Sequence, residues 1–281
     1  MSHDQSGSPR KKPRTTSSPP LLTNSKLLSL ADDSPSIIRV RDLKLTLTGP
    51  KDAWGRVGKP QPALVSVEVR LRLPFAASSA RDEVAGDTVH YGLLAKGVMG
   101  FLGGLEGGLS LVKTTSALWQ HLTGLSGGPL PPTSSTAKAF LSMDSVAYLR
   151  VSIKLSKASL LGEGVVFSQA AVFDQEEGGH VGVVSSARSL RIEGLRVPTL
   201  VGVNANEREA RQVVVANVDV QQMGGGLEDP YCDIERVVVN VSLSLVPGTI
   251  VELKDMSIPE SSSGPLIPRP FSFELYFPAW R

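Results

Sequence analysis

A strand pattern that occurs twice constrains the fold of this chain more than any single residue does. Segments 38–45 and 190–197 both alternate apolar with polar side chains, as half-buried strands do. Each is followed by a glycine, a glutamine and a strand with an acidic centre: Gly49, Gln61 and 67–69 in the first case, Gly202, Gln212 and 218–220 in the second. Two unrelated hairpins can look alike, but the shared order of these features indicates an internal duplication.

The second copy of the pattern is the shorter one. Its connecting loop has 10 positions from glycine to glutamine against 12 in the first copy, and only residues 221–233 separate its acidic strand from Ile234. We expect a third strand over 237–243, which is rich in valine, and no helical layer. An uncovered sheet exposes apolar side chains, so this half should pack on the first copy or on another subunit.

The first copy contains two more strands and two helices. Residues 38–47, 64–73 and 148–155 alternate as half-buried strands do. A fourth strand can be drawn from 165–167 and 171–173. Between the second and third strands, apolar residues recur at steps of three and four, which predicts an amphipathic helix and then a weaker one. The positions are Leu94, Val98, Phe101, Leu102 and Leu105 in the first helix, and Leu111, Thr115, Leu118, Trp119 and Leu122 in the second.

The chain divides into a tail and two copies. Residues 1–36 are rich in Ser, Pro, Lys and Arg and bury too little apolar area to offset chain entropy, so we predict disorder. The basic run at 10–14 is typical of a nuclear import signal, although a solvated tail is the simpler explanation. The first copy spans 37–175 and the second 188–281, where 271–277 is a further candidate strand.

Composition argues against several classes of function. The chain has 29 basic and 27 acidic residues, a formal net charge of +2, which favours neither nucleic acid nor an anionic membrane as a partner. It has no apolar run long enough to cross a bilayer and no apolar segment typical of a secretory signal. Its single cysteine, Cys232, cannot form an internal disulfide, which favours a reducing compartment over the alternative of a disulfide-free secreted protein. Cytoplasm is therefore the default expectation. No metal site is predicted, because the four histidines stand far apart: His3, His90, His121 and His180.

Three motifs together carry a resemblance to a known family. Residues 87–92, Asp-Thr-Val-His-Tyr-Gly, precede the first predicted helix. Residues 155–158, Leu-Ser-Lys-Ala, follow the third strand, and 202–207 form the glycine-to-glutamate loop of the second copy. In this order, and duplicated, the motifs resemble dihydroneopterin aldolase as it occurs in tandem in fungal folate-synthesis proteins. The resemblance covers 37–175 well and 188–245 in part.

The resemblance implies an α+β tunnelling fold. Here this means two tandem antiparallel β-sheet units, with two helices packed on the first and the second unit truncated. Members of the family assemble into rings and form their sites between protomers, so a homo-oligomer is expected. They cleave 7,8-dihydroneopterin by a retro-aldol reaction to 6-hydroxymethyl-7,8-dihydropterin and glycolaldehyde, without a metal or a cofactor. The pterin imine takes up the electrons, so the protein supplies proton transfer and positioning.

The resemblance also implies roles for particular residues. Lys157 would act through a bound water as base, and Tyr91 would return a proton and pack on the pterin. Glu207 would orient the substrate hydroxyls. The neighbours of Tyr91 would bind substrate: Asp87, Val89 and His90. Four of them have a plainer interpretation. A tyrosine between a strand and a helix is usually a partly buried packing residue, and His90 beside it is then structural. Lys157 at a strand end is usually just solvated, and Glu207 lies in an ordinary charged loop.

The chain departs from the family at two acidic positions. Gly55 stands near the place of the loop glutamate in the first copy, and the pterin-anchoring glutamate of the second helix falls near Val112 or Lys113. A lysine cannot accept hydrogen bonds from a pterin. One composite site could still combine Tyr91 and Lys157 with Glu207. The alternative is a catalytically degenerate pterin-binding or structural paralogue that assembles with an active homologue, and a third is a second copy shortened by a misread gene.

Overall fold

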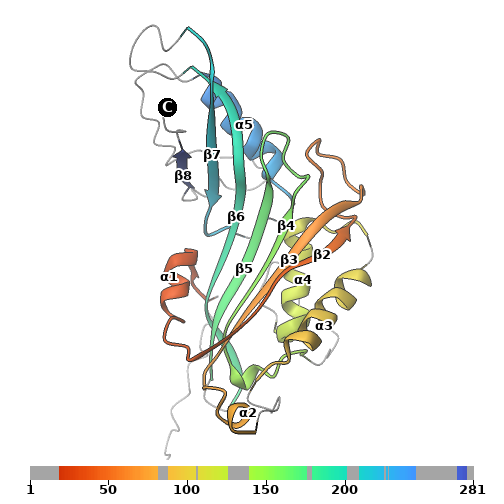
Figure 1. Ribbon diagram of the computed structural model, residues 1–281, viewed down its shortest axis with the longest axis vertical. Coiled ribbons are helices and arrows are strands. Elements are labelled where there is room, and N and C mark those ends of the chain that lie inside the picture. Colours follow the sequence, from red (N-terminus) through yellow and green to blue (C-terminus); the bar gives the residue numbers. More distant parts are fainter. Residues whose placement is uncertain are drawn as a thin grey trace, which may run out of the picture.

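One antiparallel sheet runs through the molecule (Figure 1). A computed structural model describes residues 19–81, 88–105, 107–125, 139–175, 179–200, 209–224, 226, 228–244 and 271–276. Seven strands pair in chain order, each antiparallel to the next, and β1 (Leu21–Leu22) adds to β6 in parallel. The seven are β2 (Ser36–Leu47), β3 (Gln61–Leu71), β4 (Val146–Leu155), β5 (Gly164–Gln175), β6 (Val181–Thr199), β7 (Gln212–Val220) and β8 (Phe271–Tyr276).

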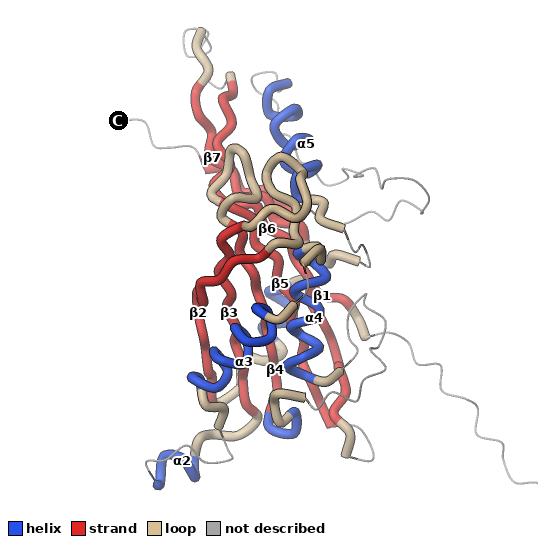
Figure 2. Tube along the Cα trace, turned by 90° about the vertical axis from the view of Figure 1, so that its right-hand side faces the viewer, coloured by secondary structure: helices blue, strands red, loops and turns tan. Residues whose placement is uncertain are grey.

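Three helices pack on one face of this sheet (Figure 2). Helix α3 (Tyr91–Gly103) lies against β2, and α4 (Leu111–Thr123) lies against β4 and β5. Helix α5 (Tyr231–Ser244) lies against β6. Two short helical turns, α2 (Ala76–Arg81) and η1 (Met143–Ser145), join the larger elements. The first half therefore has the expected order of two strands, two helices and two strands, and the predicted α+β class with two helices on the first unit is confirmed.

Helix α4 shows how the sequence pattern becomes a helix. Its predicted apolar positions are all buried against the sheet, and Trp119 stacks on Phe173 of β5 with the ring centroids 6.0 Å apart. Ser110 caps the start by accepting a hydrogen bond from the Lys113 N–H. Gly124 ends the helix with a φ of 67°, a backbone conformation that side chains other than glycine rarely adopt.

The prediction of a third strand and no helix in the second copy is wrong. Residues 237–243 belong to α5, which places one helix on the second half of the sheet. Tyr231, Ile234 and Val238 recur at steps of three and four and are buried in the main core. Burial of this stripe outweighs the strand preference of the valine run, since packing routinely overrides local propensity.

The prediction of disorder over residues 1–36 is wrong for its last part. Residues 1–18 lie outside the described residues, but α1 (Asn24–Ser29) follows β1 and lies on the sheet face opposite α3, α4 and α5. We call this the open face. Leu27 and Ala31 are buried there against Ala170 and Ala187. The segment therefore does find apolar area to bury once the sheet is present.

The two repeated hairpins share one irregularity. The pairing of β2 with β3 shifts between Val40 and Leu43, and that of β6 with β7 shifts between Ile192 and Leu195. Asp42, just before Leu43, has a φ of 54°, and Gly194, just before Leu195, has a φ of 59°. Each of these residues also donates its N–H across the hairpin at 3.0 Å, the first to Ser66 Oγ and the second to Asn217 Oδ1. The same bulge thus occurs at corresponding places in both segments.

His121 links α4 to α3 through a stacked contact, with its ring centroid 4.3 Å from that of Phe101. Burial lowers the pKa of His121 below its usual value, so the unfolded chain takes up a proton at a higher pH than the folded chain does. We therefore expect the free energy of unfolding to fall as the pH drops below about 6.5, and to fall less steeply in His121→Phe. Denaturation curves across this range compare the two slopes, and equal slopes would rule out this contribution from His121.

Candidate functional site

Tyr91 and its neighbours lie at the start of α3. Tyr91 is 70% exposed. Among the aromatic residues that the structure describes, its ring contacts only that of the adjoining His90, with the centroids 5.5 Å apart. His90 is the N-cap, because its Nδ1 accepts a hydrogen bond of 3.0 Å from the Gly92 N–H. Val89 packs against the core. The structure therefore gives His90 and Val89 structural roles, and it leaves Tyr91 open to solvent.

Lys157 lies at the other end of the helical layer. It is exposed in the turn between β4 and β5, and its carbonyl accepts a hydrogen bond of 3.2 Å from the Ala53 N–H in the β2–β3 loop, residues 48–60. The segment that follows α3 packs on the start of that same loop, where Gly107 approaches Thr48. Helix α3 has 13 residues and is thus roughly 20 Å long. Tyr91 and Lys157 of the same chain therefore lie apart. Asp87 and Glu207 lie outside the described residues.

A buried carboxylate joins the two halves of the chain beside Lys157. Asp229 is 2% exposed, and its Oδ1 accepts a hydrogen bond of 2.7 Å from the Leu111 N–H at the start of α4. Its Oδ2 accepts one of 3.1 Å from the Lys51 N–H in the β2–β3 loop. The Tyr231 hydroxyl bonds the Lys51 carbonyl and lies 3.3 Å from the same Oδ2. Burial raises the pKa of Asp229, although the N–H donors act in the opposite direction.

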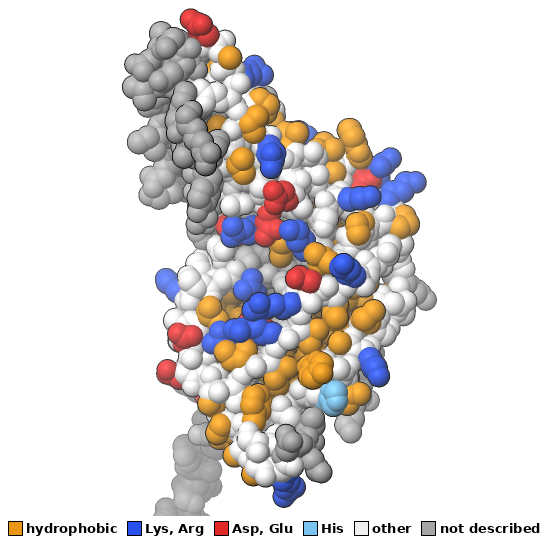
Figure 3. Space-filling model, viewed as in Figure 1, with side chains coloured by type: hydrophobic (Ala, Val, Ile, Leu, Met, Phe, Trp, Pro, Cys, Tyr) orange, Lys and Arg blue, Asp and Glu red, His pale blue; other side chains and the backbone are white. Residues whose placement is uncertain are grey.

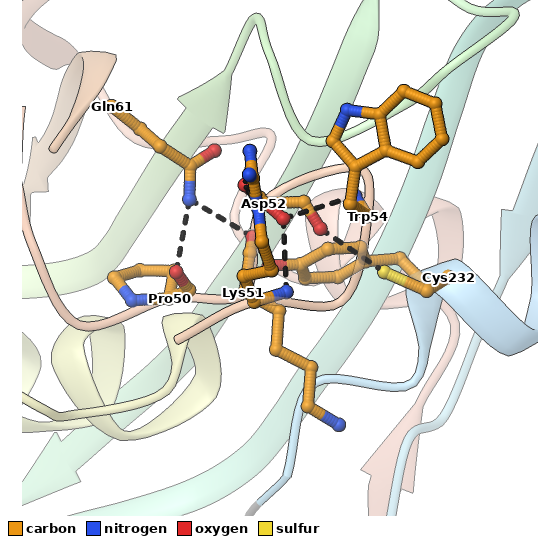
Figure 4. Close-up of polar contacts among 8 residues, drawn as sticks. Pro50, Lys51, Asp52, Trp54, Gln61 and Cys232 are labelled. Carbon is orange, nitrogen blue, oxygen red and sulfur yellow. Dashed lines mark hydrogen bonds and ion pairs between the residues drawn. The ribbon is translucent and has the colours of Figure 1, made fainter. Parts of the chain in front are cut away.

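The β2–β3 loop is itself held by polar groups (Figure 4). The Asp52 carboxylate accepts hydrogen bonds from the backbone of Trp54 and from both the backbone and the side chain of Arg56. Burial raises the pKa of Asp52, but these bonds outweigh it, so the net pKa lies below the usual range. Gln61 donates to two loop carbonyls, and the Cys232 thiol donates to the Asp52 carbonyl at 3.3 Å. The loop is therefore an ordered structure that helix α5 supports.

Glu235 supports the Lys157 turn from the same helix. This carboxylate is buried, and its Oε1 accepts hydrogen bonds from the N–H groups of Leu160 and Leu161, at 3.0 and 2.9 Å. Neither Asp229 nor Glu235 is among the sequence-predicted site residues. The second half of the chain thus supplies two buried carboxylates, which hold the β2–β3 loop and the turn that contains the predicted lysine.

The start of α4 is the place where the family resemblance puts the pterin-anchoring glutamate. Val112 is 1% exposed there and belongs to the core. The N–H groups of Leu111 and Val112 both bond Asp229. An anion-binding helix start is therefore already occupied by a carboxylate of the protein itself.

Comparisons with known proteins concern the fold. No protein-family model matches the sequence, and no curated protein matches it. Among solved structures, the chain is similar to a Burkholderia thailendensis dihydroneopterin aldolase bound to guanine, at 16% identity and a TM-score of 0.36 over 53% of this chain and 99% of that one. An E. coli dihydroneopterin aldolase in complex with neopterin is 13% identical, with a TM-score of 0.34 over 47% of this chain and 97% of that one. A hyperthermostable urate oxidase mutant from Bacillus sp. TB-90 is 11% identical, with a TM-score of 0.49 over 86% of this chain and 98% of that one. At these values the likenesses carry no argument about activity.

In the part of the chain that the structure describes, no helix is long and apolar enough to span a membrane. Nor do three or more His, Cys, Asp or Glu side chains come together there in a way that could hold a metal ion.

Proposed function

We propose that this chain is a catalytically degenerate relative of dihydroneopterin aldolase, which serves as a structural partner for further copies or for an active homologue. The observation that carries the proposal is Asp229, which occupies the start of α4 where a pterin anchor would have to act. A buried carboxylate that already accepts bonds from Leu111, Lys51 and Tyr231 has little capacity left for a substrate. Gly55 in place of the loop glutamate supports the same conclusion.

Duplication of the aldolase unit is part of this proposal. The shared bulge, with its positive-φ residue at Asp42 or Gly194 and its matching hydrogen bond, supports descent of both hairpins from one ancestor. Two joined units within one chain would already form one of the unit-to-unit contacts that a ring needs. Among the described strands, β2 pairs on one side only, so its other edge is open to a strand of another subunit. Ring assembly through this edge is therefore our proposal for the partner.

A second candidate function is the aldolase itself, with a site completed between two subunits. Tyr91 at the start of α3 and Lys157 in the β4–β5 turn are both exposed, which suits a contact that brings Tyr91 of one copy to Lys157 of the next. In such a site Lys157 would accept a proton through water, Tyr91 would donate one, and Glu207 would orient the substrate hydroxyls. Pterin binding would then require assembly.

Turnover of 7,8-dihydroneopterin separates the two candidates. For purified, folded protein whose mass in solution is first measured, we expect no release of 6-hydroxymethyl-7,8-dihydropterin, because the anchor position is filled. Lys157→Ala and Glu207→Ala are assayed alongside, with the exposed Lys59→Ala as control. Turnover that persists in Lys59→Ala but is lost in the other two would overturn the proposal and establish a shared aldolase site. Equal turnover in all four proteins would indicate a contaminating enzyme, and would thus leave the chain itself inactive as expected.

A further inference from the structure

A polar cleft lies on the open face, away from the candidate site. It has a volume of about 590 Å³, which is within the range of small-molecule sites. The segment 23–25 forms one wall, and strands β4 to β7 form the floor. On the face of the molecule that Figure 3 shows, lysine and arginine side chains gather beside α1. The floor residues are Arg150, Val166, Ser168, Ser189, Arg191, Glu193, Asp219 and Gln221.

Most charges around the cleft are paired. Lys154 Nζ lies 2.6 Å from a Glu193 carboxylate oxygen, and Arg191 Nη1 lies 3.1 Å from one of Asp219. These two ion pairs neutralise both acidic residues on the floor. The remaining charge is that of Arg150.

Arg150 lacks a carboxylate partner among the described residues. Glu68 is its neighbour across the β3–β4 pair, but that carboxylate already pairs with Arg39 and Arg70, each at 2.8 Å. The hydrogen bond found for Arg150 runs from Nη2 to Ser168 Oγ at 3.3 Å, and its Nε is buried without an acceptor in the described part of the chain. A guanidinium whose Nε is buried without an acceptor is unfavourable unless an anion completes the bonding of the group.

We propose that the cleft binds a small hydroxyl-rich carboxylate, with Arg150 as the anion anchor. One unbalanced positive charge matches a carboxylate better than a phosphate monoester, which carries about −1.5 to −2 at neutral pH. The planar guanidinium also fits a carboxylate through paired hydrogen bonds. Hydroxyl and amide groups of Thr23, Ser25, Ser189 and Gln221 line the same cleft and suit the hydroxyls of such a ligand. The site is independent of the pterin chemistry.

Gluconate is the probe for this site, and sorbitol and acetate are the matched compounds that lack the charge or the hydroxyls. Calorimetric titration of the full chain should show saturable binding of gluconate, and at least roughly tenfold weaker binding of sorbitol and of acetate. Arg150→Met should weaken gluconate binding at least roughly tenfold. Arg150→Lys keeps the charge but loses the planar fork, so its affinity for gluconate should lie between those of the wild type and of Arg150→Met. The exposed Lys44→Met on β2 is the control and should bind like the wild type.

The unliganded variants give a second readout. Without ligand, Arg150→Met should have the same Tm as the wild type or a higher one, because it removes an unbalanced charge. A protein that binds no gluconate would overturn the proposal, and so would gluconate binding that Arg150→Met leaves unchanged. If Arg150→Met unfolds, Arg150→Lys decides the matter, since undiminished binding in this variant would equally contradict an anchoring guanidinium.

Discussion

Replacement of Asp229 by alanine is expected to lower the free energy of unfolding by about 3 kcal/mol. The backbone N–H groups of Leu111 and Lys51 and the Tyr231 hydroxyl all bond this carboxylate in a buried setting. The two N–H groups would lose this acceptor, whereas the Tyr231 hydroxyl keeps the Lys51 carbonyl as its partner. A buried donor without a partner costs about 1–3 kcal/mol. The loss is smaller than the sum of these contributions, because burial of the carboxylate is itself unfavourable, as the raised pKa of Asp229 indicates.

Chemical denaturation of the wild type and of two variants measures this effect. Asp233→Ala is the matched control, because Asp233 lies nearby in the first turn of α5 but is 54% exposed and pairs with Arg236 at the surface. That change should cost no more than about 0.5 kcal/mol. Asp229→Asn keeps the shape but turns one acceptor into a donor that faces other donors, so it should also destabilise clearly. If Asp229→Ala is no worse than Asp233→Ala, the carboxylate does not hold the two halves together.

The strands and the first two helices could be predicted because local patterns agree with the packing. In α4, the predicted positions Leu111, Leu118, Trp119 and Leu122 are all buried, since a period near 3.6 places them on one face. In β3, alternate residues from Ala63 to Leu71 are buried in the same way. Where one face of an element meets the core, the sequence pattern alone identifies that face.

Helix α5 could have been predicted from a different signal. Asp229-Pro230 directly precedes the helix, and this pair is typical of a helix start. The run of valines that follows favours a strand when it is considered alone. The spacing of Tyr231, Ile234 and Val238 decides between the two, because only a helix buries all three on one sheet face.

The candidate site was the least predictable part. The Lys51–Asp229 hydrogen bond joins residues 178 positions apart, so no local pattern contains it. It depends on α5 and the residues just before it meeting the β2–β3 loop of the first half, which the family motifs do not encode. Motifs identified Tyr91 and Lys157 as a pair, but α3 separates them within one chain. The role that the structure shows for His90, the N-cap of α3, is local, whereas its predicted part in substrate binding stays a prediction.

Replacement of Gly49 by alanine is the other change for which we expect a large loss of stability, about 3 kcal/mol. Gly49 is buried at the start of the β2–β3 loop, and a Cβ there would lie 2.1 Å from the Leu109 carbonyl oxygen and 2.5 Å from the Leu109 nitrogen. Both are backbone atoms in the segment that connects α3 to α4. They cannot move aside as the end of a flexible side chain could, so the loop or the helix pair must shift.

Gly100→Ala is the matched control for Gly49→Ala. Gly100 lies on the exposed side of α3, and a Cβ there meets no heavy atom within 4 Å. Alanine should therefore stabilise the protein by roughly 0.5–1 kcal/mol, because glycine loses more backbone entropy in a helix. Urea denaturation of the three proteins should thus shift the midpoint down for Gly49→Ala and up for Gly100→Ala. A midpoint for Gly49→Ala close to that of the wild type would mean that the loop and Leu109 do not pack as closely in solution, and the ordered loop beside Lys157 would lose its support.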